Sequence, residues 1–288
     1  MSFAVTVSIL AVVTAVTCAI PGVVVVANKD AMLLDGMGHA VLPGIVVGAL
    51  LAGTINSPIL IFFAGAAAFL VALGTRWLAN TGLIAEGGAL GLVFPSMFAV
   101  GVVLLSLNFS NVHFDVHTVL VGNVNLAALQ QPSYLWTLVP IMVLNMLFVG
   151  WLLPLLGACA FDERAAHVAG VPVNALRMGM LALTSLTVTA SFYAAGVMLV
   201  IAMMVLPAAT GRILALSVRI PGLSMLSQIL LTAVVVALLG SLVGFWSAYR
   251  IDVPAAVAIT IAYALLLVAA LGAMSLRRRG RRRAPAFA

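Results

Sequence analysis

The sequence of residues 178–211 is MGMLALTSLTVTASFYAAGVMLVIAMMVLPAATG, 34 residues without a charge between Arg177 and Arg212. A helix that crosses the hydrocarbon core of a bilayer needs about 20 apolar residues. The stretch is therefore too long for one straight crossing and short for two. Ser191 and Gly196 lie near its middle, where a tight turn would divide it into two helices.

The rest of the chain has the composition of an integral membrane protein. Of its 288 residues, 65% are hydrophobic and 7% are charged, whereas about 25% of the residues in an average soluble domain are charged. Backbone groups inside lipid must be hydrogen-bonded within the protein, and no strand-length alternation is present, so the spans are predicted to be helices. The predicted fold is an all-α integral membrane protein, a polytopic bundle of about nine (eight to nine) transmembrane helices. We expect one transmembrane domain, 1–276, followed by a basic cytoplasmic tail, 277–288.

The distribution of basic residues decides between eight and nine spans. Cytoplasmic loops collect Lys and Arg. With nine spans and the N-terminus outside, only Arg250 is external, and twelve of the thirteen basic residues face the cytoplasm. One span over 178–207 would instead place Arg212, Arg219 and the tail outside. The predicted spans are therefore about 4–27, 33–52, 58–77, 88–107, 135–156, 178–193, 196–212, 222–247 and 253–275.

The net charge of +6 does not indicate a nucleic-acid partner. Six of the thirteen basic residues form the run Arg277–Arg283 beside an apolar segment, which is typical of a topology signal facing anionic membrane lipid. Cys18 and Cys159 lack CxxC spacing, so neither a disulfide framework nor a metal knuckle is predicted. The N-terminal segment lacks a basic n-region and is too long for a cleavable signal, so we expect it to be a retained first span.

One pair of ionisable residues lies inside a predicted span: Asp35 and His39, in the segment DGMGHAVLPG, 35–44. Their i, i+4 spacing places the carboxylate and the imidazole on one helix face, where both can hold one cation. Imidazole with carboxylate suits borderline divalent metals such as zinc, manganese and iron(II). Gly36 and Gly38 would allow another backbone to approach closely.

The alternative is a local ion pair that only neutralises itself near the cytoplasmic face. Two observations favour metal binding. No other predicted span contains an acid or a histidine at depth. Pro43 is also expected to break the helix one turn further on, and broken helices are where transporters build their sites.

The long external loop, 108–134, contains His113, Asp115 and His117. A solvated surface loop is the preferred interpretation, and an accessory metal-capturing site is the alternative. No nucleophile shares a segment with a base. A phosphate-binding loop requires Gly-x4-Gly-Lys-Ser/Thr, and Lys29, the one lysine, is followed by Asp30. If ATP drives this protein, another polypeptide must bind it.

The segment FDERAAHVAGVPV, 161–173, is the most charged internal stretch and lies on the predicted cytoplasmic face. Its acidic start and its Gly-x-Pro end are typical of a short helix. A solvated linker is the alternative.

Three segments together resemble the metal-ion ABC importer permease family, of the manganese/zinc/iron ABC-3 type. They are the Asp-x3-His-Ala-Val-Leu-Pro-Gly segment at 35–44, the Phe-Asp-Glu-Arg-Ala segment at 161–171 and GVMLVIAMMVLPAAT at 196–210, and their order and spacing match over nearly the whole chain. Gly38 departs from the serine that commonly precedes this histidine in the family.

This resemblance implies a function. Asp35 and His39 correspond to the membrane metal ligands of the family, and 161–171 corresponds to its coupling helix. The expected ATPase-coupling residues are Asp162, Glu163, Arg164, Ala166 and Gly170. The expected partners are cytoplasmic ABC ATPase subunits, a second permease copy or a related permease, and an extracellular or periplasmic metal-binding protein. The location implied is the bacterial inner membrane.

The leading hypothesis is thus a permease subunit that imports Mn, Zn or Fe(II). It is not itself an enzyme and binds no permanent cofactor, since the metal is cargo. The alternative from another class is a proton-coupled secondary carrier in which Asp35 and His39 relay protons, which leaves 161–171 unexplained. A membrane-embedded enzyme is the third hypothesis, and it lacks a second catalytic constellation.

Overall fold

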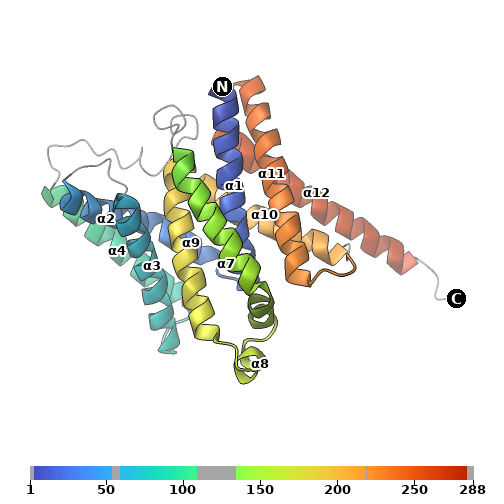
Figure 1. Ribbon diagram of the computed structural model, residues 1–288, viewed down its shortest axis with the longest axis horizontal. Helices are drawn as coiled ribbons and strands as arrows, with labels where there is room; N and C mark the ends of the chain where they lie inside the picture. Colours follow the sequence, from blue (N-terminus) through green and yellow to red (C-terminus); the bar gives the residue numbers. More distant parts are fainter. Residues whose placement is uncertain (1–2, 54–58, 109–133, 218–219, 284–288) are drawn as a thin grey trace.

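A computed structural model describes residues 3–53, 59–108, 134–217 and 220–283. His113, Asp115 and His117 lie outside these ranges. Throughout the described ranges the secondary structure is helical, without strands (Figure 1). The helices are α1 (Phe3–Ala27), α2 (Ala31–Ala52), α3 (Ile59–Asn80), α4 (Glu86–Asn108), α7 (Leu135–Phe161), α8 (Glu163–Val168), α9 (Val173–Ala195), α10 (Val197–Ser217), α11 (Met225–Ile251) and α12 (Ala255–Arg283).

Nine of the described helices are long and apolar enough to cross a membrane, which confirms the nine-span prediction. The stretch that left the count open divides at Gly196, a single residue between α9 and α10. Its φ of 77° and ψ of 163° fall in a region that only glycine occupies readily. Both helices extend past the predicted bounds, because α9 begins at Val173 and so includes Arg177, and α10 continues beyond Arg212 to Ser217. Long basic side chains near helix ends reach the interface, so they need not end a span.

Helix α1 lies at the centre of the bundle and contacts α7, α9, α10 and α11. Helices α2, α3 and α4 pack together on one side of it, whereas α11 and α12 lie on the other (Figure 1). The short helix α8 lies at the opposite end of the molecule from the N-terminus and the α11–α12 turn. This arrangement separates the predicted cytoplasmic and external ends.

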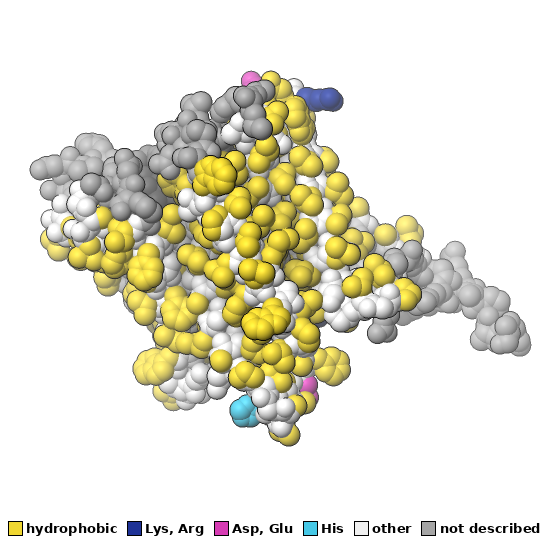
Figure 2. Space-filling model, in the orientation of Figure 1, with side chains coloured by type: hydrophobic (Ala, Val, Ile, Leu, Met, Phe, Trp, Pro, Cys, Tyr) yellow, Lys and Arg dark blue, Asp and Glu magenta, His cyan; other side chains and the backbone are white. Residues whose placement is uncertain are grey.

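The surface is largely apolar between these two ends, as expected for a protein in lipid. Figure 2 shows hydrophobic side chains over most of one face, with the few charged side chains at its extremities. Arg250 and Asp252 belong to the α11–α12 turn, and Glu163 and His167 belong to α8. The charges therefore mark the two membrane boundaries.

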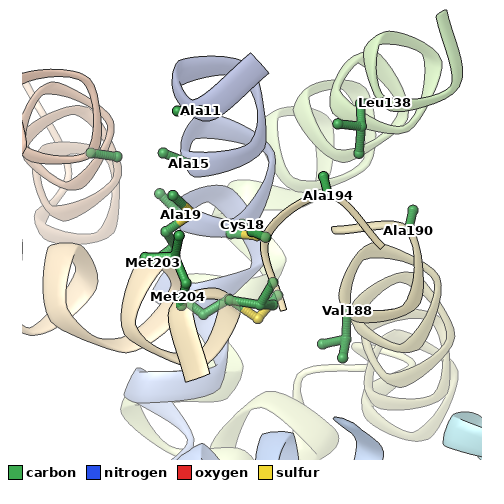
Figure 3. Close-up of a cluster of buried hydrophobic side chains, with 14 of the residues drawn as sticks. Ala11, Ala15, Cys18, Ala19, Leu138, Val188, Ala190, Ala194, Met203 and Met204 are labelled. Carbon is green, nitrogen blue, oxygen red and sulfur yellow. The ribbon is translucent and has the colours of Figure 1, made fainter. Parts of the chain in front are cut away.

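The centre of the bundle is closely packed because small residues of α1 face large ones of α10. Figure 3 shows Ala15, Cys18 and Ala19 beside Met203 and Met204. All five are buried. At Gly22, also on α1, a Cβ atom would lie 2.3 Å from the carbonyl oxygen of Met204. Small residues of this kind let membrane helices approach closely in the absence of a hydrophobic driving force.

A buried polar junction joins three of the central helices. The side-chain amide of Asn145 on α7 donates to the carbonyl oxygen of Thr17 on α1 at 3.0 Å and to the hydroxyl of Thr187 on α9 at 2.9 Å. Hydrogen bonds between membrane helices contribute about 0.6–2 kcal/mol each. This junction fixes α9 against α1, and α2 packs on α9 in turn.

Candidate functional site

Helix α2 carries the predicted metal ligands. It begins directly after Asp30 and continues unbroken to Ala52, so the expectation that Pro43 breaks the helix is wrong. The ring of Pro43 is accommodated because α4 has a glycine opposite it: a Cβ atom on Gly101 would lie 2.8 Å from the Cβ of Pro43. A proline inside a helix still removes one backbone hydrogen bond, here to the carbonyl of His39.

Asp35 and His39 lie on one face of α2, as their spacing predicts. The Nε2 atom of His39 is 3.7 Å from Oδ1 of Asp35. The side chain of His39 is 26% exposed and that of Asp35 is 56% exposed. The pair is too far apart for a hydrogen bond. Its donor atoms are spaced like neighbouring ligands of a metal ion, because two ligands on a tetrahedral ion with bonds of about 2.1 Å lie about 3.4 Å apart.

Two aromatic rings of α4 flank the imidazole of His39. The ring centroid of Phe94 lies 5.1 Å away at an interplanar angle of 37°, and that of Phe98 lies 6.2 Å away nearly edge-on at 87°. Aromatic pairs favour tilted and edge-to-face arrangements at these distances. Helix α4 therefore limits the rotation of the imidazole and shields one side of it from water.

The glycines beside the pair make room for side chains rather than for another backbone. A Cβ atom on Gly36 would lie 2.6 Å from Cδ1 of Leu90 on α4, and one on Gly38 would lie 3.0 Å from Cγ1 of Val197 on α10. The expectation that a backbone approaches here is therefore wrong. Through these two contacts α2 packs against α4 on one side and against the start of α10 on the other.

The described part of the chain offers no third ligand beside this pair. Nowhere in it do three or more His, Cys, Asp or Glu side chains come together as they would around a metal ion. Asp35 and His39 therefore supply two donor atoms, and the other positions around an ion would have to be filled from elsewhere.

A second charged cluster lies at the predicted cytoplasmic end of the bundle, and the sequence analysis missed it. Arg76 on α3 donates to the carboxylate of Asp30, which immediately precedes α2, and each of these side chains is 12% exposed. Burial raises the pKa of the Asp30 carboxyl above its ordinary value, and the nearby Arg76 guanidinium opposes that rise. Sequence periodicity cannot pair two residues that are 46 positions apart.

The same end carries a more exposed ion pair between α8 and α9. The two terminal nitrogens of the Arg177 guanidinium contact the two carboxylate oxygens of Glu163, Nη1 to Oε1 at 3.1 Å and Nη2 to Oε2 at 3.2 Å. The side chain of Arg177 is 41% exposed and that of Glu163 is 49% exposed. Arg177 also lines a pocket between the adjacent ends of α1, α2, α3 and α9, together with Asn28, Asp30 and Arg76. One partner of the exposed pair and both partners of the buried pair therefore line one pocket.

The segment predicted to couple to an ATPase forms the short helix α8. The carboxylate of Asp162 caps it by accepting from the backbone N–H groups of Arg164 at 2.9 Å and Ala165 at 3.0 Å. Gly170 ends it in a left-handed conformation, with a φ of 84°. Asp162, Glu163, Arg164 and Gly170 are exposed. Ala166 is only 5% exposed, so its side chain faces the protein.

Two apolar side chains at α8 are almost fully exposed, one at the end of α7 and one at the end of α8 itself, and the sequence analysis did not single them out. Phe161 is 94% exposed and Val168 is 88% exposed. They lie at the same end as the charged residues of α8 rather than in the apolar band. Exposed large apolar residues outside the lipid region mark an interaction surface when they lie together.

The sequence is similar to those of known proteins over most of its length. The sequence pattern of the ABC 3 transport family matches residues 1–273. The manganese transport system membrane protein MntD of Bacillus subtilis (strain 168) is 31% identical over 223 residues, which cover 74% of this chain and 75% of that protein. The chelated iron transport system membrane protein YfeD of Yersinia pestis is 34% identical over 272 residues, which cover 91% and 82%.

The fold also matches a solved structure. The structure of PsaBC from Streptococcus pneumoniae in complex with Fab superposes with a TM-score of 0.76 at 22% identity, over 94% of this chain and 91% of that one. At this identity the likeness concerns the fold, and it extends over nearly the whole bundle.

Proposed function

The chain belongs to the ABC 3 transport family and is a multi-pass bacterial membrane protein, and we propose that it is the permease subunit of an ATP-driven importer of a divalent transition metal. The observation that carries the proposal is the pair formed by Asp35 and His39. It combines a carboxylate with an imidazole, 3.7 Å apart, within a span. Ionisable side chains in a span are costly and mark ion pathways.

The choice of cargo follows from the donor atoms. Imidazole nitrogen with carboxylate oxygen suits Mn(II), Fe(II) and Zn(II), whereas calcium prefers oxygen ligands alone. The similar proteins from Bacillus subtilis and Yersinia pestis are named for manganese and for chelated iron. We therefore place the cargo among manganese, iron and zinc.

The incomplete ligand set supports a pair of permeases. One chain offers two ligands, and Asp35 is 56% exposed within the apolar bundle. A carboxylate facing lipid would be costly. A second copy, or a related permease, opposite α2 would cover it and bring two more ligands. Two carboxylates and two imidazoles form a tetrahedral zinc shell, and added water gives the six-coordinate shell of manganese.

Energy has to come from a separate subunit, because the sequence lacks a phosphate-binding loop. We assign the docking of a cytoplasmic ATPase to α8 and its exposed residues Asp162, Glu163, Arg164 and Gly170, with Phe161 and Val168 as apolar anchors. Ala166 contributes by packing α8 onto the bundle. An extracellular metal-binding protein would deliver the ion to the opposite end. The chain is thus a transport subunit rather than an enzyme.

Transport in proteoliposomes tests this function. The chain would be co-purified with the ATPase of its own transport system, reconstituted and loaded with ATP on the ATPase side. Uptake of radioactive manganese, iron(II) or zinc should require ATP and persist when an ionophore collapses the proton gradient. Uptake that depends on the proton gradient and proceeds without the ATPase would instead identify a secondary carrier.

A further inference from the structure

The strongest feature that this function does not use is the meeting of two ion pairs at the cytoplasmic end. One pair, Glu163 with Arg177, joins α8 to α9. The other, Asp30 with Arg76, joins the start of α2 to α3. Both Arg177 and Asp30 line the pocket between α1, α2, α3 and α9. The guanidinium of Arg177 therefore stands between α8, the proposed docking helix, and α2, which carries the proposed metal ligands.

The two pairs differ in how readily they exchange partners. Exposed ion pairs such as Glu163–Arg177, with side chains 41–49% exposed, contribute little to stability and are made and broken easily. Breaking a buried pair is far more costly, because it leaves a charge without a partner. A second cation beside Asp30 can share its carboxylate with Arg76, so that neither buried charge is left without a partner. Arg177, which lines the same pocket, is the cation in position to do so.

The connection from Asp30 to the metal site is short and rigid. Asp30 immediately precedes the first residue of α2, and its carbonyl oxygen accepts from the N–H of Leu33 at 2.9 Å. Asp35 follows five residues later on the same unbroken helix. A change in what holds Asp30 is therefore passed directly to Asp35 and His39.

We propose that Arg177 relays movement of α8 to α2 by exchanging its carboxylate partner. With α8 in the position described here, Glu163 holds Arg177, and the Asp30–Arg76 pair fixes the start of α2. When α8 is displaced, Arg177 leaves Glu163, turns further into the pocket that it already lines and shares Asp30 with Arg76. The hold of Arg76 on the start of α2 is then weakened, and the metal ligands move with it. This relay rests on the proposed function, since the ATPase supplies the displacement.

The first test measures metal ions imported per ATP hydrolysed by the reconstituted complex. Arg177→Gln should lower this ratio by about 2- to 30-fold, the range of coupling changes seen for residues between sites, while complex assembly and ATP hydrolysis persist. Arg212→Gln is the matched control, since it removes one exposed arginine from the same membrane side. It should leave the ratio unchanged. An unchanged ratio in Arg177→Gln would overturn the relay.

A charge exchange separates the relay from a simple link between α8 and α9. The double variant Glu163→Arg, Arg177→Glu restores the α8–α9 ion pair but puts a second carboxylate beside Asp30. The relay predicts that the ratio stays low in complexes that still assemble and hydrolyse ATP. Recovery of the wild-type ratio would show that Arg177 only holds α8 in place.

A measurement on the permease alone keeps the relay testable even if transport fails. In nanodiscs without the ATPase, Glu163→Gln frees Arg177 to compete for Asp30. Amide hydrogen exchange over residues 30–35 should then become faster than in the wild type, and Arg212→Gln should not change it. Unchanged exchange in Glu163→Gln refutes the relay. Absence of ATP-driven uptake by the wild type with normal exchange behaviour refutes the proposed function instead.

Discussion

The imidazole of His39 lies 5.1 Å from the ring of Phe94, so the nitrogen ligand of the proposed site is positioned by a neighbouring helix. Asp35, one turn earlier, is more than half exposed and makes no comparable contact among the described residues. The site therefore combines one oriented ligand with one that is free to move. Such a combination suits an ion that must be bound and then released.

The most direct prediction concerns the two ligands themselves. Asp35→Asn keeps the shape of the side chain but removes the charge that offsets desolvation of the cation. His39→Ala removes the imidazole donor. Each variant should insert, assemble and bind the ATPase normally, while metal uptake per folded permease falls to near background.

The double variant decides whether this pair binds metal or only neutralises itself. If the two charges serve only each other, removing one should lower the yield of protein, and removing both should restore yield and uptake. Near-normal transport by the Asp35→Asn, His39→Ala variant is therefore the result that would contradict metal binding.

The aromatic contact predicts a positioning role for Phe94. Phe94→Leu keeps an apolar side chain but removes the ring beside His39, so the imidazole gains rotational freedom that metal binding must remove. We expect the apparent Kd for the metal, measured by calorimetry on the permease, to rise by about 2- to 10-fold, since aromatic pairs contribute about 0.5–1.5 kcal/mol. Phe62→Leu, on the 69% exposed Phe62, is the matched control and should leave the Kd unchanged.

The buried pair at the start of α2 predicts an asymmetry between its partners. A guanidinium cannot lose its proton in a protein, whereas a carboxylate can accept one. Asp30→Asn leaves Arg76 charged and unpaired, and should cost up to about 3 kcal/mol of stability, the low end for buried pairs. Arg76→Gln should cost less, because Asp30 can become neutral.

The direction of the pKa shift of Asp30 predicts how the stability of these variants depends on pH. Burial raises the pKa of Asp30 in the folded state, so the folded protein binds the proton more tightly than the unfolded chain does. Stability from this group therefore declines as the pH rises through the folded pKa. Thermal unfolding of Arg76→Gln should show a higher melting temperature at about pH 5 than at about pH 7.5 relative to the wild type. The deficit of Asp30→Asn against the wild type should be smaller at about pH 7.5 than at about pH 5, because the variant lacks the titrating carboxyl, and the opposite pattern would contradict the assignment.

Phe161 and Val168 should dominate the binding of the ATPase. Interface energy concentrates in a few large side chains that become fully desolvated. Phe161→Ala should weaken the complex by about tenfold or more, as measured by surface plasmon resonance with the permease in nanodiscs. Ile251→Ala removes a comparably exposed apolar side chain, 70% exposed, from the opposite end and should have no effect.

The topology predicts which engineered thiols react from outside. In a Cys159→Ser background, Val253→Cys at the end shared with the N-terminus should react with a membrane-impermeant maleimide in intact spheroplasts. Val168→Cys should react only after lysis. Cys18 can remain, because it is fully buried. Labelling of Val168→Cys before lysis would reverse the orientation.

The sequence predicts the spans well because each is a local property. Charge placement gave nine crossings, and the turn expected between Ser191 and Gly196 is the break before α10. The Asp35–His39 pair is local too, being one helical turn. The sequence does not tell which helix faces meet. The pairing of Asp30 with Arg76 and the rings beside His39 depend on how α2 packs against α3 and α4.

Local rules also failed where neighbours compensate. Pro43 does not break α2, because Gly101 on α4 leaves space for its ring. Ala166 lies in the charged segment yet is buried, because a six-residue helix on the bundle surface must turn one side inward. Neither outcome can be derived without the packing partner.

The single glycine between α9 and α10 bears on how the protein enters the membrane during synthesis. Helix α9 is rich in hydroxyl side chains. The hydroxyl of Ser185 donates to the carbonyl oxygen of Leu181 and that of Thr187 donates to the carbonyl oxygen of Leu183, each at 2.8 Å. Helix α9 is therefore less hydrophobic than α10, with a mean hydropathy of 1.3 against 2.0, and it partitions into lipid less readily. Because one residue separates the two helices, α9 cannot pass from the translocon into the bilayer before α10 has entered the translocon. The pair should therefore leave the translocon together as a helical hairpin, with the more apolar α10 carrying α9 into the bilayer.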